Sequence, residues 1–203
     1  MIDKNNVIQS ITTEKKIVLE LGCGSNKRHA EAIGIDALDY SCVDIVGDIY
    51  EVLAQFPSNS VDEVYSYHFI EHIENINKLV EELSRVVKLG GTIDFVVPHF
   101  SNPYFYSDPT HRNFFGLYTF CYFSAASQLK RKVPTHQKKL KFKLNKVDLG
   151  FKSSRPFLVR HAIKKSIGII FNSSTYMKEL YEEFFCYLFP CYEIHYRLTR
   201  EDT

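Results

Sequence analysis

The sequence lacks several features that would assign it to a specialised class of protein. It contains no tryptophan and only two methionines, and no apolar run approaches the roughly 20 residues of a membrane-spanning helix. The first residues, MIDKNNVIQS, carry neither the basic nor the apolar region of a secretory signal. Five cysteines without a CxxC pair predict free thiols in a reducing cytoplasm and no zinc site. We therefore expect a cytoplasmic protein without a membrane span.

Charge is balanced in total but not along the chain. The net charge is +1, yet residues 1–98 hold 16 acids and 8 bases, whereas residues 99–203 hold 8 acids and 17 bases. Residues 130–146 contain eight bases and no acids. Such a run is either a solvated basic face or a surface for an anionic partner. At 203 residues the chain is long enough for one domain with a full-sized core.

A glycine turn between two apolar runs organises the first half of the chain. Residues 17–21 (IVLEL) are typical of a buried parallel strand, and residues 33–36 (IGID) of a second strand that ends in a carboxylate. The intervening Gly-Cys-Gly turn lets a ligand approach the backbone, and Asp36 can accept hydrogen bonds from a ribose diol. The dinucleotide pattern GxGxxG fails, because Lys27 stands three residues after Gly24.

The ELGCG turn with its downstream acid resembles motif I of the class I methyltransferases that use S-adenosylmethionine (SAM). The resemblance implies that Glu20 lies near the methionine ammonium and that Asp36 binds the ribose hydroxyls. It also implies that Asp48 accepts from the adenine amino group while the Ile49 N–H reaches the ring. An N-cap role for Asp48 is the alternative and does not exclude the first. The expected cofactor-binding residues are Glu20, Gly22, Cys23, Gly24, Asp36, Asp48, Ile49, Ser66 and His68.

The resemblance implies a Rossmann-like α/β fold with a mainly parallel sheet and an antiparallel edge strand. Eight residues, 25–32, separate Gly24 from the second strand, so the first crossover helix is stunted or absent, and residues 37–42 leave little room for the second. We expect a single methyltransferase domain over residues 1–203. It comprises a lead-in at 1–16, a substrate or lid insertion at 98–135 and a helical region at 150–190.

Apolar periodicity places the later elements. It predicts strands at residues 61–66 and 92–97, around a helix from Asn75 to Lys88 that the glycine pair 90–91 ends. Residues 124–128 are expected to continue a helical stretch, and an amphipathic helix is expected over residues 177–188. The alternating run at 191–199 predicts a final strand, paired with a strand at residues 140–149.

The stretch YHFIEHI after the fourth strand is similar to an HxxEH stretch of many small-molecule methyltransferases. His68 and His72 are four residues apart, so on a helix they share a face with Glu71 beside them. That spacing could hold a metal, although the order differs from HExxH. Capping and packing roles are the alternative, and we expect no metal.

The most specific resemblance lies in an aromatic segment, residues 98–120. Its SDPTHRNFF sequence resembles the DPTHxxxF loop of a group of predicted SAM-dependent methyltransferases, common in bacterial capsule and lipopolysaccharide gene clusters. The resemblance covers residues 17–200. The loop follows the fifth strand, at the carboxyl edge where open α/β sheets bind ligands.

Methyl transfer needs alignment of the acceptor, and a base if the acceptor is a hydroxyl. His99 and His111 are the candidate bases, and Asp108 could orient an imidazole, although structural and turn-forming roles suit all three. Arg112 could clamp a carboxylate or phosphate. Tyr104 and Tyr106, with neighbouring phenylalanines that include Phe114 and Phe115, could wall the acceptor site, although core packing explains some of them.

We therefore expect a SAM-dependent enzyme that methylates an oxygen of a small anionic acceptor, such as a sugar or phosphoryl-type oxygen on a nucleotide-activated or lipid-linked precursor. The gene setting of the group suggests surface-polysaccharide biosynthesis. Two alternatives are an RNA methyltransferase that uses the basic run and a non-catalytic SAM-binding or partner-binding protein. No RGG or RNP motif is present, so we do not expect nucleic acid as a partner. The protein is expected to be a monomer or a homodimer.

Overall fold

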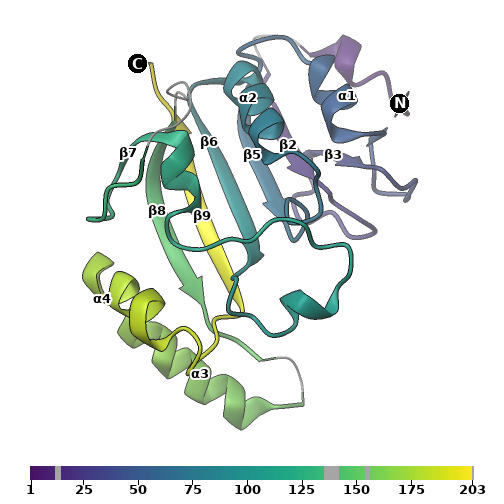
Figure 1. Cartoon of the computed structure of the whole chain (residues 1–203). Coiled ribbons are helices and arrows are strands. Elements are labelled where there is room, and N and C mark those ends of the chain that lie inside the picture. Colours follow the sequence, from purple (N-terminus) through teal and green to yellow (C-terminus); the bar gives the residue numbers. More distant parts are fainter. Residues whose placement is uncertain (12–14, 135–141, 154–155, 203) are drawn as a thin grey trace.

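A mixed sheet runs through the computed structural model, which describes residues 1–11, 15–134, 142–153 and 156–202. Nine strands of these described residues form the sheet, and Figure 1 shows the central ones side by side. In order across the sheet they are β1 (Ile2–Asp3), β4 (Ile45–Val46), β3 (Ile33–Asp36), β2 (Val18–Leu21), β5 (Val61–Tyr67), β6 (Val87–Pro98), β9 (Glu193–Arg200), β8 (Phe142–Gly150) and β7 (Ser124–Ser127).

The strand pairing confirms the Rossmann-like sheet. The five strands from β4 to β6 pair in parallel, and the apolar run of β2 is buried along its whole length, as suits a parallel strand. β9 runs antiparallel to both β6 and β8, which confirms the predicted pairing of the last strand. β8 is not an edge strand of the described sheet, because β7 pairs with Phe142 to Leu144.

Two pairs of helices accompany the sheet. α1 (Ile49–Ala54) and α2 (Ile76–Val86) lie side by side over the parallel strands (Figure 1). α3 (Leu158–Phe171) and α4 (Thr175–Leu180) pack against each other at the β8 end of the sheet, and α4 continues into a π-helical turn, Tyr181–Phe185. Residues 22–32 and 37–44, all of them described, contain no helix. The prediction of reduced early crossover helices is therefore confirmed.

The helix expected from Asn75 to Lys88 ends at Val86, and the glycine pair does not cap it. Val87 is fully buried and pairs with Val61, so the chain passes from α2 directly into β6. Gly90, with φ +78°, lies where the β5–β6 register shifts. Lys88 forms an ion pair with Asp62 at 2.8 Å instead of complementing the helix dipole. Pairing with the sheet thus overrides the helical pattern.

Other local predictions are also corrected. The helix expected at residues 124–128 is wrong, because Ser124–Ser127 pair with β8 as β7. By contrast, the 14-residue helix α3 lies within the helical region expected at residues 150–190. In the described part of the lead-in, the chain forms β1 and a 3-10 turn at Ile8–Ser10.

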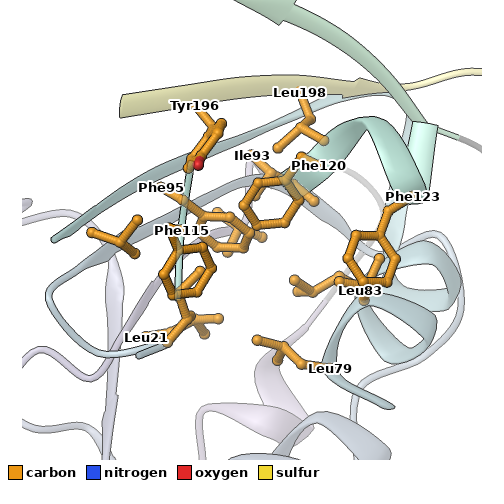
Figure 2. Close-up of a cluster of buried hydrophobic side chains, with 14 of the residues drawn as sticks. Leu21, Leu79, Leu83, Ile93, Phe95, Phe115, Phe120, Phe123, Tyr196 and Leu198 are labelled. Carbon is orange, nitrogen blue, oxygen red and sulfur yellow. The ribbon is translucent and has the colours of Figure 1, made fainter. Parts of the chain in front are cut away.

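The aromatic segment after β6 forms part of the core, as Figure 2 shows. Its Phe120 packs against Phe95 of β6 and Tyr196 of β9, and Phe115 and the following Phe123 pack against Phe120. The Tyr196 hydroxyl donates to the Gly116 carbonyl at 2.6 Å, which ties the segment to the sheet. Because each such side chain stabilises the fold by about 1.5–3 kcal/mol when buried, the segment is an integral layer of the fold.

Two further observations concern the chain as a whole. No helix in the described residues combines the length and the apolarity that crossing a bilayer requires. All five cysteines are free, as the sequence predicts.

Candidate functional site

The turn after β2 requires glycine for steric reasons. Gly22 and Gly24 have φ angles of +63° and +58°, a region that other residues rarely adopt. A Cβ atom at Gly22 would also lie 2.2 Å from Cγ of Phe69. At Gly24 nothing lies within 4 Å of the Cβ position, so a ligand can approach the backbone there.

Asp36, at the end of β3, holds this turn in place. Its Oδ2 atom accepts a hydrogen bond from the Gly24 N–H at 2.8 Å, and Oδ1 accepts one from the Leu38 N–H at 2.9 Å. Each carboxylate oxygen has a second lone pair, so the same carboxylate can still accept hydrogen bonds from a ribose diol. The structure therefore brings the predicted Gly24 and Asp36 together.

Asp48 is the N-cap of α1. Its Oδ1 atom accepts hydrogen bonds from the N–H groups of Tyr50, at 2.9 Å, and Glu51, at 3.3 Å. The predicted N-cap role is thus confirmed. Ile49 follows as the first residue of α1, and both residues lie at the same pocket as Asp36.

This pocket has a volume of about 360 Å³, within the range of small-ligand sites. It offers two carboxylates that can accept from hydroxyl and amino donors and the apolar side chains of Ile49, Phe69 and Ile73. The other residues that line the pocket were not predicted from the sequence as cofactor contacts, although each of them lies near a strand end or in or beside the HxxEH stretch. Those wall residues are Ile35, Ala37, Gly47, Tyr50, Phe69, His72, Ile73 and Glu74.

Glu20 holds in place the loop of residues 22–32, which stands where the first crossover helix would be. Its carboxylate is 2% exposed and accepts hydrogen bonds from the N–H groups of Arg28 and His29 at 2.8–3.0 Å. The His29 ring stacks on Tyr65 with centroids 3.8 Å apart. Glu20 does not line the 360 Å³ pocket, so its place near the methionine ammonium stays a prediction.

Cys23 and Ser66 are buried and do not line that pocket either. Burial raises the pKa of the Cys23 thiol to about 12, so the thiol is protonated at neutral pH. The Ser66 hydroxyl has no hydrogen-bond partner among the described residues. Contact of either residue with the cofactor stays a prediction.

His68 lies between two carboxylates just after β5. Its Nε2 atom is 3.1 Å from Glu193, and its Nδ1 atom is 3.6 Å from Glu71. Burial acts to lower the pKa of His68, but hydrogen bonds to Glu193 and then Glu71 outweigh it and raise the pKa to about 9. The imidazole is therefore a cation at neutral pH. It does not line the 360 Å³ pocket, so its predicted contact with the cofactor is untested.

Replacing Glu193 with glutamine should lower the free energy of unfolding by about 3 kcal/mol at neutral pH, because it breaks a buried ion pair. The carboxylate contacts His68, Lys152 and His195 at 2.5–3.1 Å. Burial acts to raise its pKa, but these three hydrogen bonds lower it below the usual 4.5. The stabilisation is therefore complete above pH 4.5 and is lost as the pH falls through the folded-state pKa. Urea unfolding of both proteins should show their difference shrinking in acid, and a pH-independent difference would contradict this.

The structure separates the two candidate bases. His99 is fully buried, with Nδ1 2.8 Å from the Ser101 hydroxyl and Nε2 3.3 Å from Glu182. Glu182 also accepts a hydrogen bond from the Leu117 N–H at 2.6 Å. His99 does not line the pocket, so in this conformation it orders the aromatic segment.

His111 lies beside the pocket, packed against His72 with ring centroids 4.7 Å apart. Its Nδ1 atom is 2.9 Å from the Phe105 carbonyl. Because a carbonyl only accepts, Nδ1 carries a proton, so in the neutral form of the ring the lone pair lies on Nε2. Asp108 Oδ2 is 3.7 Å from this Nε2, too far for a hydrogen bond. Asp108 does form the predicted turn, since its Oδ1 accepts from the Thr110 N–H and hydroxyl.

The predicted acceptor-binding residues differ in exposure. Tyr104 and Tyr106 are 60% and 62% exposed, and the Tyr106 hydroxyl donates to the Phe100 carbonyl. Arg112 lines the pocket and pairs with Glu74 at 2.9 Å, with both side chains largely exposed. Phe114 is exposed, whereas Phe115 is fully buried and belongs to the core.

Comparisons with known proteins agree with this fold. Residues 19–95 match the family model described as a methyltransferase domain. A SAM-dependent methyltransferase from Archaeoglobus fulgidus has a similar structure, with 19% identity over 96% of this chain and 90% of that one and a TM-score of 0.56. The YcgJ protein from Bacillus subtilis gives 16% identity over 98% and 97%, with a TM-score of 0.55. No curated protein sequence gives a significant match.

A further similar structure was determined with the cofactor bound. Phosphoethanolamine N-methyltransferase 2 from Haemonchus contortus, in complex with SAM, shares 14% identity over 98% of this chain and 53% of that one, with a TM-score of 0.51. At such identities the structural likeness establishes the fold, and the family match covers β2 to β6, the strands that carry the glycine turn, Asp36 and Asp48. Residues 19–95 therefore match a methyltransferase domain, and the chain has the Rossmann-like fold of methyltransferases that use S-adenosylmethionine as their methyl donor.

Proposed function

We propose that this methyltransferase methylates an oxygen of a small anionic acceptor. One observation carries the proposal: residues predicted for the cofactor (Asp36, Asp48 and Ile49) and one predicted for the acceptor (Arg112) line the same pocket. Cofactor and acceptor would thus meet at one surface, as an in-line displacement from the sulfonium carbon requires.

The adenosine end of SAM would occupy the 360 Å³ pocket. Asp36 would accept hydrogen bonds from the ribose hydroxyls and Asp48 from the adenine amino group, with the Ile49 N–H directed at the ring. The methionine end would extend along the Gly22 to Gly24 turn. SAM supplies the activated methyl group, and the protein supplies position and shields the reaction from water.

Arg112 is the proposed anchor of the acceptor's negative charge. Its ion pair with Glu74 lies at the surface, with 58% and 77% of the two side chains exposed, and such a pair contributes only about 0–1 kcal/mol. A phosphate or carboxylate can therefore displace Glu74 from the guanidinium. The excess of 17 bases over 8 acids in residues 99–203 favours the same sign of acceptor.

A nucleotide-activated or lipid-linked sugar of a cytoplasmic surface-polysaccharide pathway has the required chemistry, since it offers hydroxyls beside phosphates. Labelled SAM incubated with a panel of nucleotide-sugars and cell-envelope precursors, followed by mass spectrometry, tests the assignment. A methylated oxygen on an anionic member would support it. Methyl transfer to RNA alone, or tight SAM binding without any turnover, would overturn it in favour of an RNA methyltransferase or a non-catalytic binding protein.

Removal of the acceptor's proton is assigned to the imidazole pair of His72 and His111. Replacing His111 with asparagine should lower kcat by about 10²–10⁴-fold, the usual contribution of a group that assists proton transfer. The asparagine amide can still donate to the Phe105 carbonyl, as Nδ1 does at 2.9 Å, but nothing replaces Nε2. Binding of S-adenosylhomocysteine, measured by calorimetry, should stay unchanged.

A matched control is His161→Asn, in α3, whose imidazole bonds only to the backbone of Ser153 among the hydrogen bonds of the described residues. It should keep full turnover. Full turnover by the His111 variant would show that the assignment of the proton transfer is wrong.

A further inference from the structure

Three side chains from two segments converge beside the pocket. Glu71 and His72 follow β5, and His111 comes from the loop near residue 110. One potential ligand atom of each lies within 4.8 Å of the other two. Glu71 Oε1 is 3.9 Å from Nε2 of His72. His72 lines the nucleoside pocket, so the cluster borders the site described above.

The hydrogen bonds of both imidazoles direct an unprotonated nitrogen toward this cluster. His111 donates from Nδ1 to the Phe105 carbonyl at 2.9 Å. Thr110 donates its single hydroxyl proton to Asp108 at 2.6 Å, so its oxygen must accept the hydrogen bond from Nδ1 of His72 at 2.8 Å. With Nδ1 held by an acceptor, each ring in its neutral form presents the lone pair of Nε2, which is the arrangement of histidines that bind metals.

The carboxylate in the cluster is only partly compensated by the protein, because the His68 cation lies 3.6 Å from Oε1 and nothing among the described residues bonds to Oε2. Glu71 is 1% exposed, and its Oε2 atom has no hydrogen-bond partner among the described residues. Oε1 is 3.6 Å from His68 and 3.9 Å from His72, too far for good hydrogen bonds. Burying an ionised carboxylate is costly unless it is paired or coordinates a metal. A further cation beside Glu71 would remove the remaining cost.

We propose that Glu71, His72 and His111 bind one divalent transition-metal ion, with Zn²⁺ the ion whose ligand preferences they match. Two imidazole nitrogens and one carboxylate form a common zinc donor set, whereas Mg²⁺ and Ca²⁺ prefer oxygen ligands. Zinc bonds of about 2.0–2.1 Å place tetrahedral ligand atoms about 3.4 Å apart, so the observed cluster must contract by about 1 Å. Asp108, with Oδ2 3.7 Å from Nε2 of His111, is within reach of the fourth position.

This site differs from the sequence-based expectation of no metal. That expectation concerned His68 and His72 as the possible ligands. His111 of the DPTH loop supplies the additional ligand. His68 is not a ligand, because its Nε2 atom pairs with Glu193 at 3.1 Å. The ion would join the loop to the segment after β5 at the edge of the pocket. In the metal-loaded protein the lone pairs of His72 and His111 would be used by the ion, which would lower the pKa of a bound acceptor hydroxyl so that its proton passes to solvent water; the proton transfer to His111 proposed above applies to the metal-free protein. The site itself does not depend on the identity of the acceptor.

Calorimetry of the full chain, stripped with a chelator and titrated with Zn²⁺, tests the proposal. We expect one ion per chain, confirmed by elemental analysis of the dialysed protein. His72→Ala and Glu71→Gln should each weaken Zn²⁺ binding by more than about 100-fold, because changes to groups outside the ligand shell alone cost about 10–100-fold. The control His161→Ala should bind as tightly as the unaltered protein.

Thr110→Val provides a second variant that keeps every proposed ligand. It removes the acceptor for Nδ1 of His72 and should weaken Zn²⁺ binding by about 10–100-fold with the fold intact by circular dichroism. Zinc binding that is absent, or equal in the His72, Thr110 and His161 variants, would overturn the metal site. S-adenosylhomocysteine binding by the stripped protein is measured in parallel, so failure of the metal site and failure of the cofactor pocket are separate results.

Discussion

Replacing Asp36 with alanine should weaken binding of S-adenosylhomocysteine by at least about 100-fold. A hydrogen bond to a charged group contributes about 1.5–3 kcal/mol, and two such bonds to the ribose diol exceed the roughly 2.7 kcal/mol that corresponds to 100-fold. The variant also removes the acceptor of the Gly24 N–H at 2.8 Å, so the glycine turn loses its fixed position. Isothermal titration calorimetry of the full chain measures the change directly.

A deoxy ligand separates these two causes. The 2′-deoxy analogue of S-adenosylhomocysteine should bind the unaltered protein more weakly than the parent does, and the Asp36 variant should not distinguish the two ligands. Asp39→Ala is the matched control, because Asp39 is exposed and pairs with Lys4 at the surface. Equal affinity of the parent ligand for the unaltered protein and the Asp36 variant would place the ribose elsewhere and would end the proposed cofactor geometry.

Replacing Gly22 with alanine should lower the free energy of unfolding by about 2–5 kcal/mol. A residue with a Cβ at positive φ costs about 1–2 kcal/mol, and the φ of Gly22 is +63°. The new methyl group would also lie 2.2 Å from Cγ of Phe69, and such overpacking adds about 1–3 kcal/mol. Because Phe69 lines the nucleoside pocket, ligand binding should weaken as well. Urea denaturation followed by circular dichroism measures the stability.

Two further variants separate the steric from the conformational cost. Gly90→Ala has φ +78° but nothing within 4 Å of its Cβ position, so it should show only the conformational cost. The double variant Gly22→Ala with Phe69→Gly should be more stable than the sum of the two single effects predicts, because Phe69→Gly removes both the ring and the Cβ atom that lies 2.4 Å from the new methyl group. Additive effects in the double variant would show that the Phe69 contact does not limit position 22.

Elements with a strong local signal were predictable from the sequence. β3 occupies residues 33–36, as its apolar run and terminal Asp36 predict. The absence of a first crossover helix follows from the eight residues available between Gly24 and β3. The glycine turn and the N-cap at Asp48 are also local, because their reasons lie within a few residues of the chain. These features fixed one side of the pocket in advance.

Features that depend on distant partners were not predictable in this way. The helix boundary at Val86 is set by the pairing of Val87 with Val61, and the burial of His99 by Glu182, 83 residues later. Phe114 and Phe115 are adjacent and chemically alike, yet one is 59% exposed and the other fully buried. Only the packing of the aromatic segment against β9 distinguishes them.

The position of β9 has a consequence for how the protein is made. β9 is the only described link between β6 and the β8–β7 pair, and it follows both of them in the chain. While a ribosome is still adding residues 99–192, the β6 edge therefore has no antiparallel neighbour, and β8 cannot yet join the main sheet. An unpaired strand edge invites association with other chains. The nascent chain would thus depend most on chaperones during the interval in which the aromatic segment has emerged but its closing strand has not.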